Sequence, residues 1–274
     1  MENVRNRLKQ DIMGNIKQEL LKWSKEWTEK FNNLSETYHN PYYTQSPLDA
    51  IEETVDVLFV GINPGEPKDS IKQPNHYTPE QFLKGNPAWK ERFKDGKNVW
   101  KFTNGARFFM GYDAQMHQDT IDNDAKVVWT NLSPFSSQNG FSDLPEELKE
   151  EGINCFIDLL KRLQPQKVVF LGGDAFKLID RYAPDDIKQN FEHTTVFDNV
   201  PLEIGRIYGR PAYYVSHPSR KWAVSNSFIP VFIFLRDLYD VYENGKPKYK
   251  KLNVIKDIMR REMKLWQERI KIED

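Results

Sequence analysis

Apolar residues along the chain follow two patterns, one with helical spacing and one of short continuous runs. Near the N-terminus they recur every three or four residues, which predicts an amphipathic helix over 2–31. We expect this helix to dock onto the rest of the protein; a partner-binding helix is the alternative. Further helices are predicted over 144–163, 173–181, 225–242 and 251–271. Short β-branched and apolar runs predict buried strands over 55–60, 126–132, 167–171 and 212–215.

Strands and helices alternate in this pattern, which is typical of a parallel sheet covered on both faces. We therefore predict a three-layer α/β/α fold with a central four-stranded, mainly parallel sheet. Residues 194–200 and 202–208 are expected to form a short hairpin or an irregular excursion, and 68–100 to form loops and short helices. We expect a single domain over 1–274, with its core over about 38–242 and the helices 2–31 and 251–271 outside that core.

Composition, net charge and cysteine count limit the classes of function that the chain could have. The 274 residues are 39% apolar and 29% charged, as in ordinary globular proteins. The net charge of −1 argues against a strongly cationic nucleic-acid binder, although residues 246–274 carry ten basic and five acidic groups. That basic tail could add phosphate affinity or be a solvated helix face. The single cysteine, Cys155, excludes an internal disulfide, a four-cysteine zinc site and an iron–sulfur cluster.

No apolar run is long enough to cross a bilayer, and the N-terminus has no apolar signal core. These features predict an intracellular protein, cytoplasmic if it is bacterial and nuclear if it is eukaryotic, with no membrane partner. We expect a monomer.

Three polar clusters lie at the carboxyl ends of predicted strands: GINPG (61–65) after the first, TNLSP (130–134) at the second and SHPS (216–219) after the last. The carboxyl ends of parallel strands meet at one edge of a sheet, which is where ligands bind in such folds. The sequence therefore predicts a binding site at this edge that contains Asn63, Asn131 and His217.

These clusters resemble the motifs of the uracil-DNA glycosylase superfamily, and most closely its single-strand-selective monofunctional branch. YHNPYY (38–43) is similar to the branch's Tyr-Asn-Pro segment, and VLFVGINPGEP (57–67) resembles its first strand and water-activating loop. TNLSPF (130–135) resembles its base-recognition segment, and SHPSR (216–220) resembles its second catalytic loop. The resemblance spans about 38–240, and the lone cysteine agrees with a cluster-free branch. It implies a DNA glycosylase with no cofactor and no metal.

The resemblance also implies roles for individual residues. Asn63 would hold the attacking water through its amide oxygen, where other branches have an aspartate; an amide positions water more than it acts as a general base. His217 would donate a hydrogen bond to O2 of the departing pyrimidine. Asn131 would pair with the edge of uracil or, after an amide flip, of cytosine. The structural alternatives are a turn asparagine, an ordinary histidine and a strand-end asparagine.

The base pocket and the DNA contacts follow from the same resemblance. Gly65 stands where the uracil-specific branch has a tyrosine, so substituents at pyrimidine C5 could enter; alternatively it is a turn glycine with positive φ. Phe102 is our choice, over Phe108 and Phe109, for the aromatic platform under the base. The residues expected to contact DNA and fill the gap left by the flipped nucleotide are Ser216, Ser219, Arg220, Lys221 and Trp222. An exposed basic loop is the alternative for this segment.

Three functional hypotheses follow. The first is a monofunctional DNA glycosylase that removes uracil or a C5-modified pyrimidine and leaves an abasic site, since no lysine for a Schiff-base step lies inside the motifs. The second is a glycosylase that removes hydroxymethylated or glucosylated cytosine from viral DNA, as an anti-phage defence. The third is an inactive module on the same fold that binds DNA or another partner.

Overall fold

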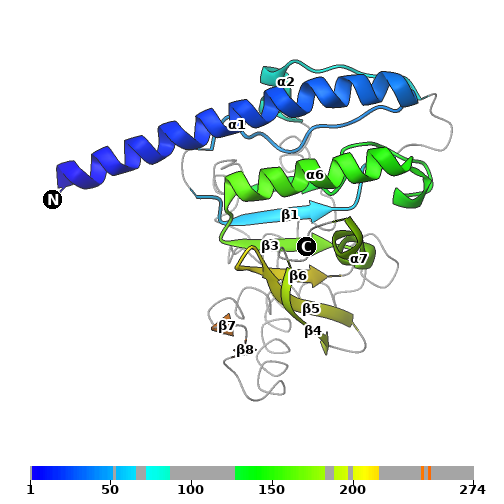
Figure 1. Ribbon diagram of the computed structural model, residues 1–274. Coiled ribbons are helices and arrows are strands. Elements are labelled where there is room, and N and C mark those ends of the chain that lie inside the picture. Colours follow the sequence, from blue (N-terminus) through cyan, green and yellow to red (C-terminus); the bar gives the residue numbers. More distant parts are fainter. Residues whose placement is uncertain are drawn as a thin grey trace, which may run out of the picture.

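The computed structural model describes residues 2–51, 54–65, 72–86, 127–182, 188–196, 200–215, 242–243 and 246–247. Its central feature is a twisted sheet (Figure 1). The strands across this sheet are, in order, β2 (Val127–Asn131), β1 (Val57–Gly61), β3 (Lys167–Leu171), β6 (Arg210–Val215), β5 (Val200–Ile207) and β4 (Lys188–Val196). The first four run parallel, so the predicted α/β fold with a mainly parallel sheet is confirmed.

The sheet has six strands, where the sequence predicted four. A hairpin forms as predicted, but the bounds of its first strand were wrong: β4 begins six residues before the predicted start at 194, and Val200 already belongs to β5. Both strands extend the sheet from the β6 edge in antiparallel order. A two-residue turn joins β5 to β6, with φ of 48° at Tyr208 and 70° at Gly209. Positive φ at both central residues is the geometry that matches the twist of a tight hairpin. This turn makes β5 a direct neighbour of β6.

Both faces of β1 are buried, which explains its uninterrupted apolar run. Leu58 and Val60 belong to the main hydrophobic core and are fully buried. Phe59 points to the opposite face, because successive side chains of a strand alternate. There it stacks on Trp129 of β2, with ring centroids 4.3 Å apart and planes inclined by 15°. The parallel register places these two residues opposite each other.

Two helices, α6 (Glu146–Leu163) and α1 (Glu2–Tyr38), pack against each other and share the main hydrophobic core with the sheet. In Figure 1, α1 runs alongside α6 and its N-terminal part extends beyond the end of α6. Helix α1 continues past the predicted end at residue 31. Its residues Leu20, Trp23 and Phe31 are at most 2% exposed and belong to the main core, so this helix packs as an integral part of the described structure.

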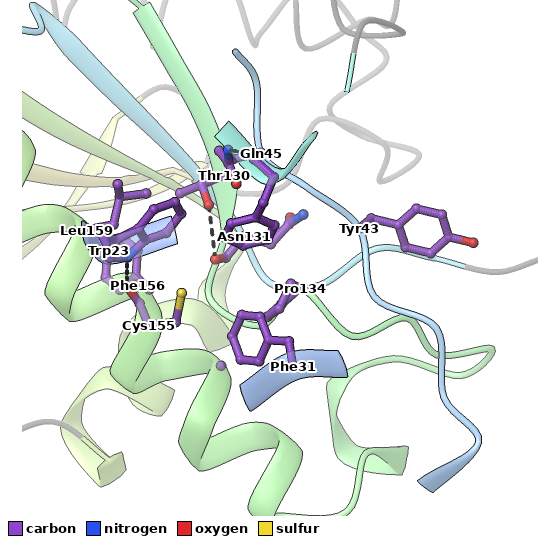
Figure 2. Close-up of a pocket in the computed structure, with 12 residues that line it drawn as sticks. Trp23, Phe31, Tyr43, Gln45, Thr130, Asn131, Pro134, Cys155, Phe156 and Leu159 are labelled. Carbon is purple, nitrogen blue, oxygen red and sulfur yellow. Dashed lines mark hydrogen bonds between the residues drawn. The ribbon is translucent and has the colours of Figure 1, made fainter. Parts of the chain in front are cut away.

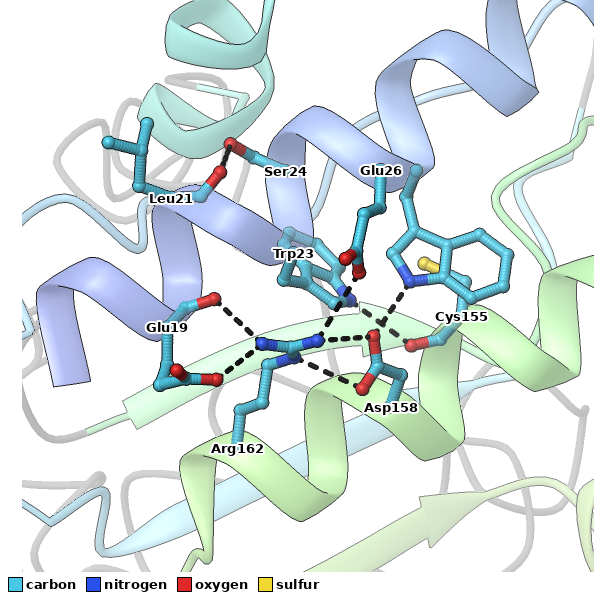
Figure 3. Close-up of polar contacts among 9 residues, drawn as sticks. Glu19, Leu21, Trp23, Ser24, Glu26, Cys155, Asp158 and Arg162 are labelled. Atoms are coloured by element: carbon cyan, nitrogen blue, oxygen red, sulfur yellow. Dashed lines mark hydrogen bonds and ion pairs between the residues drawn. The ribbon is translucent and has the colours of Figure 1, made fainter. Parts of the chain in front are cut away.

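Polar contacts add to this packing (Figure 3). The guanidinium of Arg162 on α6 donates to the carboxylates of Glu19 (2.6 Å) and Glu26 (3.3 Å) on α1. It also donates to Asp158 on its own helix (3.0 Å), whose carboxylate accepts from Trp27 Nε1 of α1 (2.9 Å). Arg162 is only 14% exposed, so the pairs are partly shielded from water. The network therefore fixes the position of α1 along α6.

Two shorter helices complete the described core. Helix α7 (Gly173–Tyr182) follows β3, and α2 (Pro79–Lys84) packs against α1. Thr78 and Gln81 form a capping box at the start of α2. None of the helices among the described residues is long and apolar enough to cross a membrane.

The C-terminal predictions fall mostly outside the described residues. This holds for the helix at 251–271 and for nearly all of the helix at 225–242. Tyr242, its last residue, lies instead in β7 (Tyr242–Glu243), which pairs with β8 (Lys246–Pro247). The end of that predicted helix was therefore wrong.

Candidate functional site

The loops that follow β1 and β2 lie side by side at the carboxyl edge of the sheet. The parallel register ends with Gly61 opposite Asn131. Beyond it, Leu132 N–H donates to Gly61 O (2.9 Å), and Ser133 N–H donates to Ile62 O (3.0 Å). A bridge between Gly65 and Ser137 continues the pairing. The strand order thus brings together two of the predicted clusters, although about 70 residues separate them in the sequence.

Asn63 lies in the loop after β1, and the hydrogen bonds of its carboxamide are all made by the nitrogen, Nδ2. Nδ2 donates to Ser137 Oγ (2.8 Å) and Pro64 O (3.1 Å), with Phe135 O at 3.5 Å. Among the described residues, none donates a hydrogen bond to Oδ1 of Asn63. The bond to Pro64 O fits the turn-asparagine alternative, but it uses only the amide nitrogen. The amide oxygen therefore remains available to accept a hydrogen bond from a bound molecule.

Asn131 ends β2, and its carboxamide lies against Gly61. A Cβ on Gly61 would come within 2.3 Å of Asn131 Oδ1, so only glycine leaves room for this side chain. Within the part of the chain that the structure describes, no hydrogen bond engages the carboxamide of Asn131. This amide can therefore pair in either orientation, unlike that of Asn63.

Gly65 faces open space at the end of the first loop. A Cβ built there meets no atom of the described residues within 4 Å, and the φ of Gly65 is outside the left-handed region. The backbone conformation therefore does not require glycine, and the alternative interpretation of Gly65 as a turn glycine with positive φ was wrong. Because Gly65 has no side chain, the described residues leave space beside the loop after β1.

The YHNPYY segment supports the second loop from its other side. Tyr43 N–H donates to Pro134 O (2.9 Å), and Ser136 N–H donates to Pro41 O (3.1 Å). The buried Asn40 donates from Nδ2 to Ser136 O (3.1 Å). This motif therefore acts on the site by holding the loop after β2 in place.

A small cavity lies on the core side of the same edge (Figure 2). Its volume is about 20 Å³, and its wall includes Thr130, Asn131, Gln45 and Cys155. That volume suits one water molecule and excludes a nucleobase. Burial raises the pKa of the Cys155 thiol well above its usual value, so this cysteine is a neutral packing residue.

The remaining predicted site residues lie outside the described part of the chain. They are Phe102, Ser216, His217, Ser219, Arg220, Lys221 and Trp222. Strand β6 ends at Val215, opposite Leu171 at the end of the parallel strand β3. Strand β6 therefore ends at the same edge of the sheet as β1 and β2, and His217 is two residues further along the sequence. In the described ranges, no group of three or more His, Cys, Asp or Glu side chains could hold a metal ion.

Sequence reasoning missed two residues at this edge, Ser137 and Gly61. Ser137 lies six residues after Asn131 in an ordinary serine pair, and the only signal is a small polar residue beyond the motif. Gly61 appears in the sequence as the first residue of GINPG, and nothing there signals its contact with Asn131.

Comparison with protein-family models adds independent evidence. The model of the uracil DNA glycosylase superfamily matches residues 48–228, a range that includes Asn63, Asn131 and His217. No curated protein is significantly similar to the chain.

Proposed function

The chain belongs to the uracil DNA glycosylase superfamily, and from this premise we propose that it is a monofunctional DNA glycosylase. It flips a pyrimidine out of DNA, hydrolyses the N-glycosidic bond and leaves an abasic site. The pyrimidine is uracil or carries a substituent at C5. The partner is DNA, and we propose that the enzyme acts as a monomer without metal or cofactor.

The orientation of Asn63 carries this proposal. Cleavage of an N-glycosidic bond builds positive charge on the sugar and negative charge on the departing base, and water then captures the sugar. An acceptor that holds this water needs a fixed position more than a high basicity. The carboxamide of Asn63 has its nitrogen bonded to the loop and its oxygen available, which suits that task.

Asn131 supports recognition of the flipped base. Its carboxamide offers a donor and an acceptor in one plane, which can pair with uracil or, after rotation, with cytosine. We propose that His217 stabilises the charge that develops on O2, and that Phe102 stacks on the base. Ser216, Ser219, Arg220, Lys221 and Trp222 grip the phosphates and fill the gap in the DNA.

The open space at Gly65 favours a second candidate substrate. Among the described residues, no atom lies within 4 Å of a Cβ at this position, so they present no obstacle to a bulky C5 group. The candidate is hydroxymethylated or glucosylated cytosine in viral DNA, whose removal would act as an anti-phage defence. Because the amide of Asn131 can pair in either orientation, both substrate classes remain compatible with the site.

Excision from defined oligonucleotides tests the function. The substrates contain one uracil, one 5-hydroxymethyluracil or one glucosylated hydroxymethylcytosine, and an unmodified strand serves as control. Alkali cleaves the strand wherever an abasic site has formed. We expect cleavage of at least one modified strand and no cleavage without alkali. An absence of abasic sites from every substrate would contradict the proposal and favour the inactive binding module.

Substitution of Asn63 separates catalysis from binding. Asn63→Ala removes the acceptor for water, so we expect the single-turnover rate to fall about 100-fold. DNA affinity should stay the same, because the side chain acts on the water. Equal losses of rate and affinity would show that Asn63 only maintains the loop.

A further inference from the structure

We propose that Ser137 is a positioning residue, whose hydroxyl fixes the carboxamide of Asn63 with its oxygen toward the reacting water. This inference rests on the proposed glycosylase function and assigns to it a residue beyond the recognised motifs. Ser137 acts through Asn63 and has no contact with the reacting atoms in this mechanism.

The three atoms around Nδ2 of Asn63 determine which way the amide faces. Two of them, Pro64 O and Phe135 O, are backbone carbonyl oxygens and can only accept hydrogen bonds. With the amide reversed, Oδ1 would face both carbonyls with no proton between them. The nitrogen must therefore occupy this side, and the oxygen is directed away from it.

Ser137 supplies the shortest of the three contacts, at 2.8 Å, against 3.1 Å and 3.5 Å for the carbonyls. The contact to Phe135 O is at the outer limit of a hydrogen bond, so without Ser137 only one good acceptor remains for two amide protons. The amide could then rotate about its χ2 angle, whose energy profile is broad.

The position of Ser137 is itself tightly defined. Ser137 is 1% exposed, and its backbone N–H donates to Pro64 O (3.1 Å). Its Oγ accepts a second hydrogen bond from Gly140 N–H (3.1 Å). Because backbone groups from both loops hold this serine, its hydroxyl offers a nearly fixed acceptor to Asn63.

A double-mutant cycle in the full-length chain tests this role. Ser137→Ala is made with Asn63 present and with Asn63→Ala, and single-turnover excision is measured on the best substrate of the wild-type protein. We expect Ser137→Ala to lower the rate about tenfold beside Asn63 and to have no effect beside alanine. The DNA affinity should be unchanged in both backgrounds. A structural role would lower the rate equally in both, because Gly140 N–H loses its acceptor in either case, and that result would overturn the inference.

Ser136→Ala is the matched control. This neighbouring serine is also buried, and its hydroxyl donates to Pro41 O (3.3 Å) instead of contacting Asn63. It should lower the melting temperature about as much as Ser137→Ala, with an unchanged excision rate.

Ser137→Cys guards against misfolding of the alanine variant, since sulfur fills the space but accepts hydrogen bonds poorly. The excision rate of this variant should also be about tenfold lower than that of the wild type. A wild-type excision rate in a folded Cys variant would refute the role of the hydroxyl. A wild-type protein that excises no base would refute the glycosylase function and this inference together. A normal wild-type rate with an unaffected Ser137→Ala would refute only the inference.

Discussion

Gly61→Ala is the substitution whose effect the structure defines most sharply. An added Cβ would lie 2.3 Å from Asn131 Oδ1, whereas real Cβ atoms essentially never approach another atom closer than 3.0 Å. The oxygen must therefore move by about 0.7 Å or more, the difference between these two distances. Because the atom that moves is the end of a side chain, the fold should change little, by less than about 1 kcal/mol in free energy of unfolding.

The loss of activity should be larger than the loss of stability. A misplacement of about 1 Å at a reacting centre lowers rates by about 100-fold. For a shift of about 0.7 Å we expect a 10- to 100-fold lower excision rate, which corresponds to about 1.4–2.7 kcal/mol in the activation barrier. Asn131 would still be present, but its donor and acceptor would no longer align with the edge of the base.

The assay is single-turnover excision, with thermal unfolding measured on the same samples. Asn131→Ala provides the control background, because it removes the oxygen that the new Cβ would strike. Gly61→Ala should have no further effect on the rate in that background. A full excision rate for Gly61→Ala beside Asn131 would refute the contact, and equal losses in both backgrounds would refute the proposed route through Asn131.

Four further predictions concern other parts of the described chain. Gly65→Tyr should retain activity on uracil and lose activity on substrates with a C5 substituent, as measured by competition between the two oligonucleotides. Equal losses on both substrates would contradict the role proposed for the space beside Gly65. Gly152→Ala should lower the free energy of unfolding by about 1–2 kcal/mol in urea, because its Cβ would strike Ser133 at 2.5–2.7 Å, including backbone. Arg162→Ala should lower the free energy of unfolding by about 1–2 kcal/mol, because three partly shielded carboxylates lose their cation. An unchanged urea midpoint would show that packing alone holds α1. The thiol of Cys155 should resist a thiol reagent at pH 8 until the protein is unfolded, since burial raises its pKa; rapid labelling of the native protein would contradict that burial.

Local sequence patterns predicted much of the fold. The parallel strands were predicted within two residues because each is a short apolar run, and α6 because its apolar positions repeat with helical spacing. The pairing of β4 and β5 with the sheet was missed, because mixed polar and apolar residues leave the partner of a strand undefined. The length of α1 was underestimated, since its last turns are mostly polar.

At the carboxyl edge of the sheet, too, the sequence determined some features of the candidate site and the tertiary structure determined others. The sequence alone determined which residue types stand at the ends of the strands, and the parallel order implied that Asn63 and Asn131 would lie at the same edge of the sheet. The tertiary structure alone decided the orientation of Asn63, through the carbonyl of Phe135 and the hydroxyl of Ser137, which are 72 and 74 residues away in the sequence. The tertiary structure also explains the glycine at position 61, because the carboxamide of Asn131 on the neighbouring strand β2 occupies the space that a Cβ would need. Periodicity and turn preference act between near neighbours in the sequence, whereas the direction of this amide depends on atoms that only folding brings within hydrogen-bond distance.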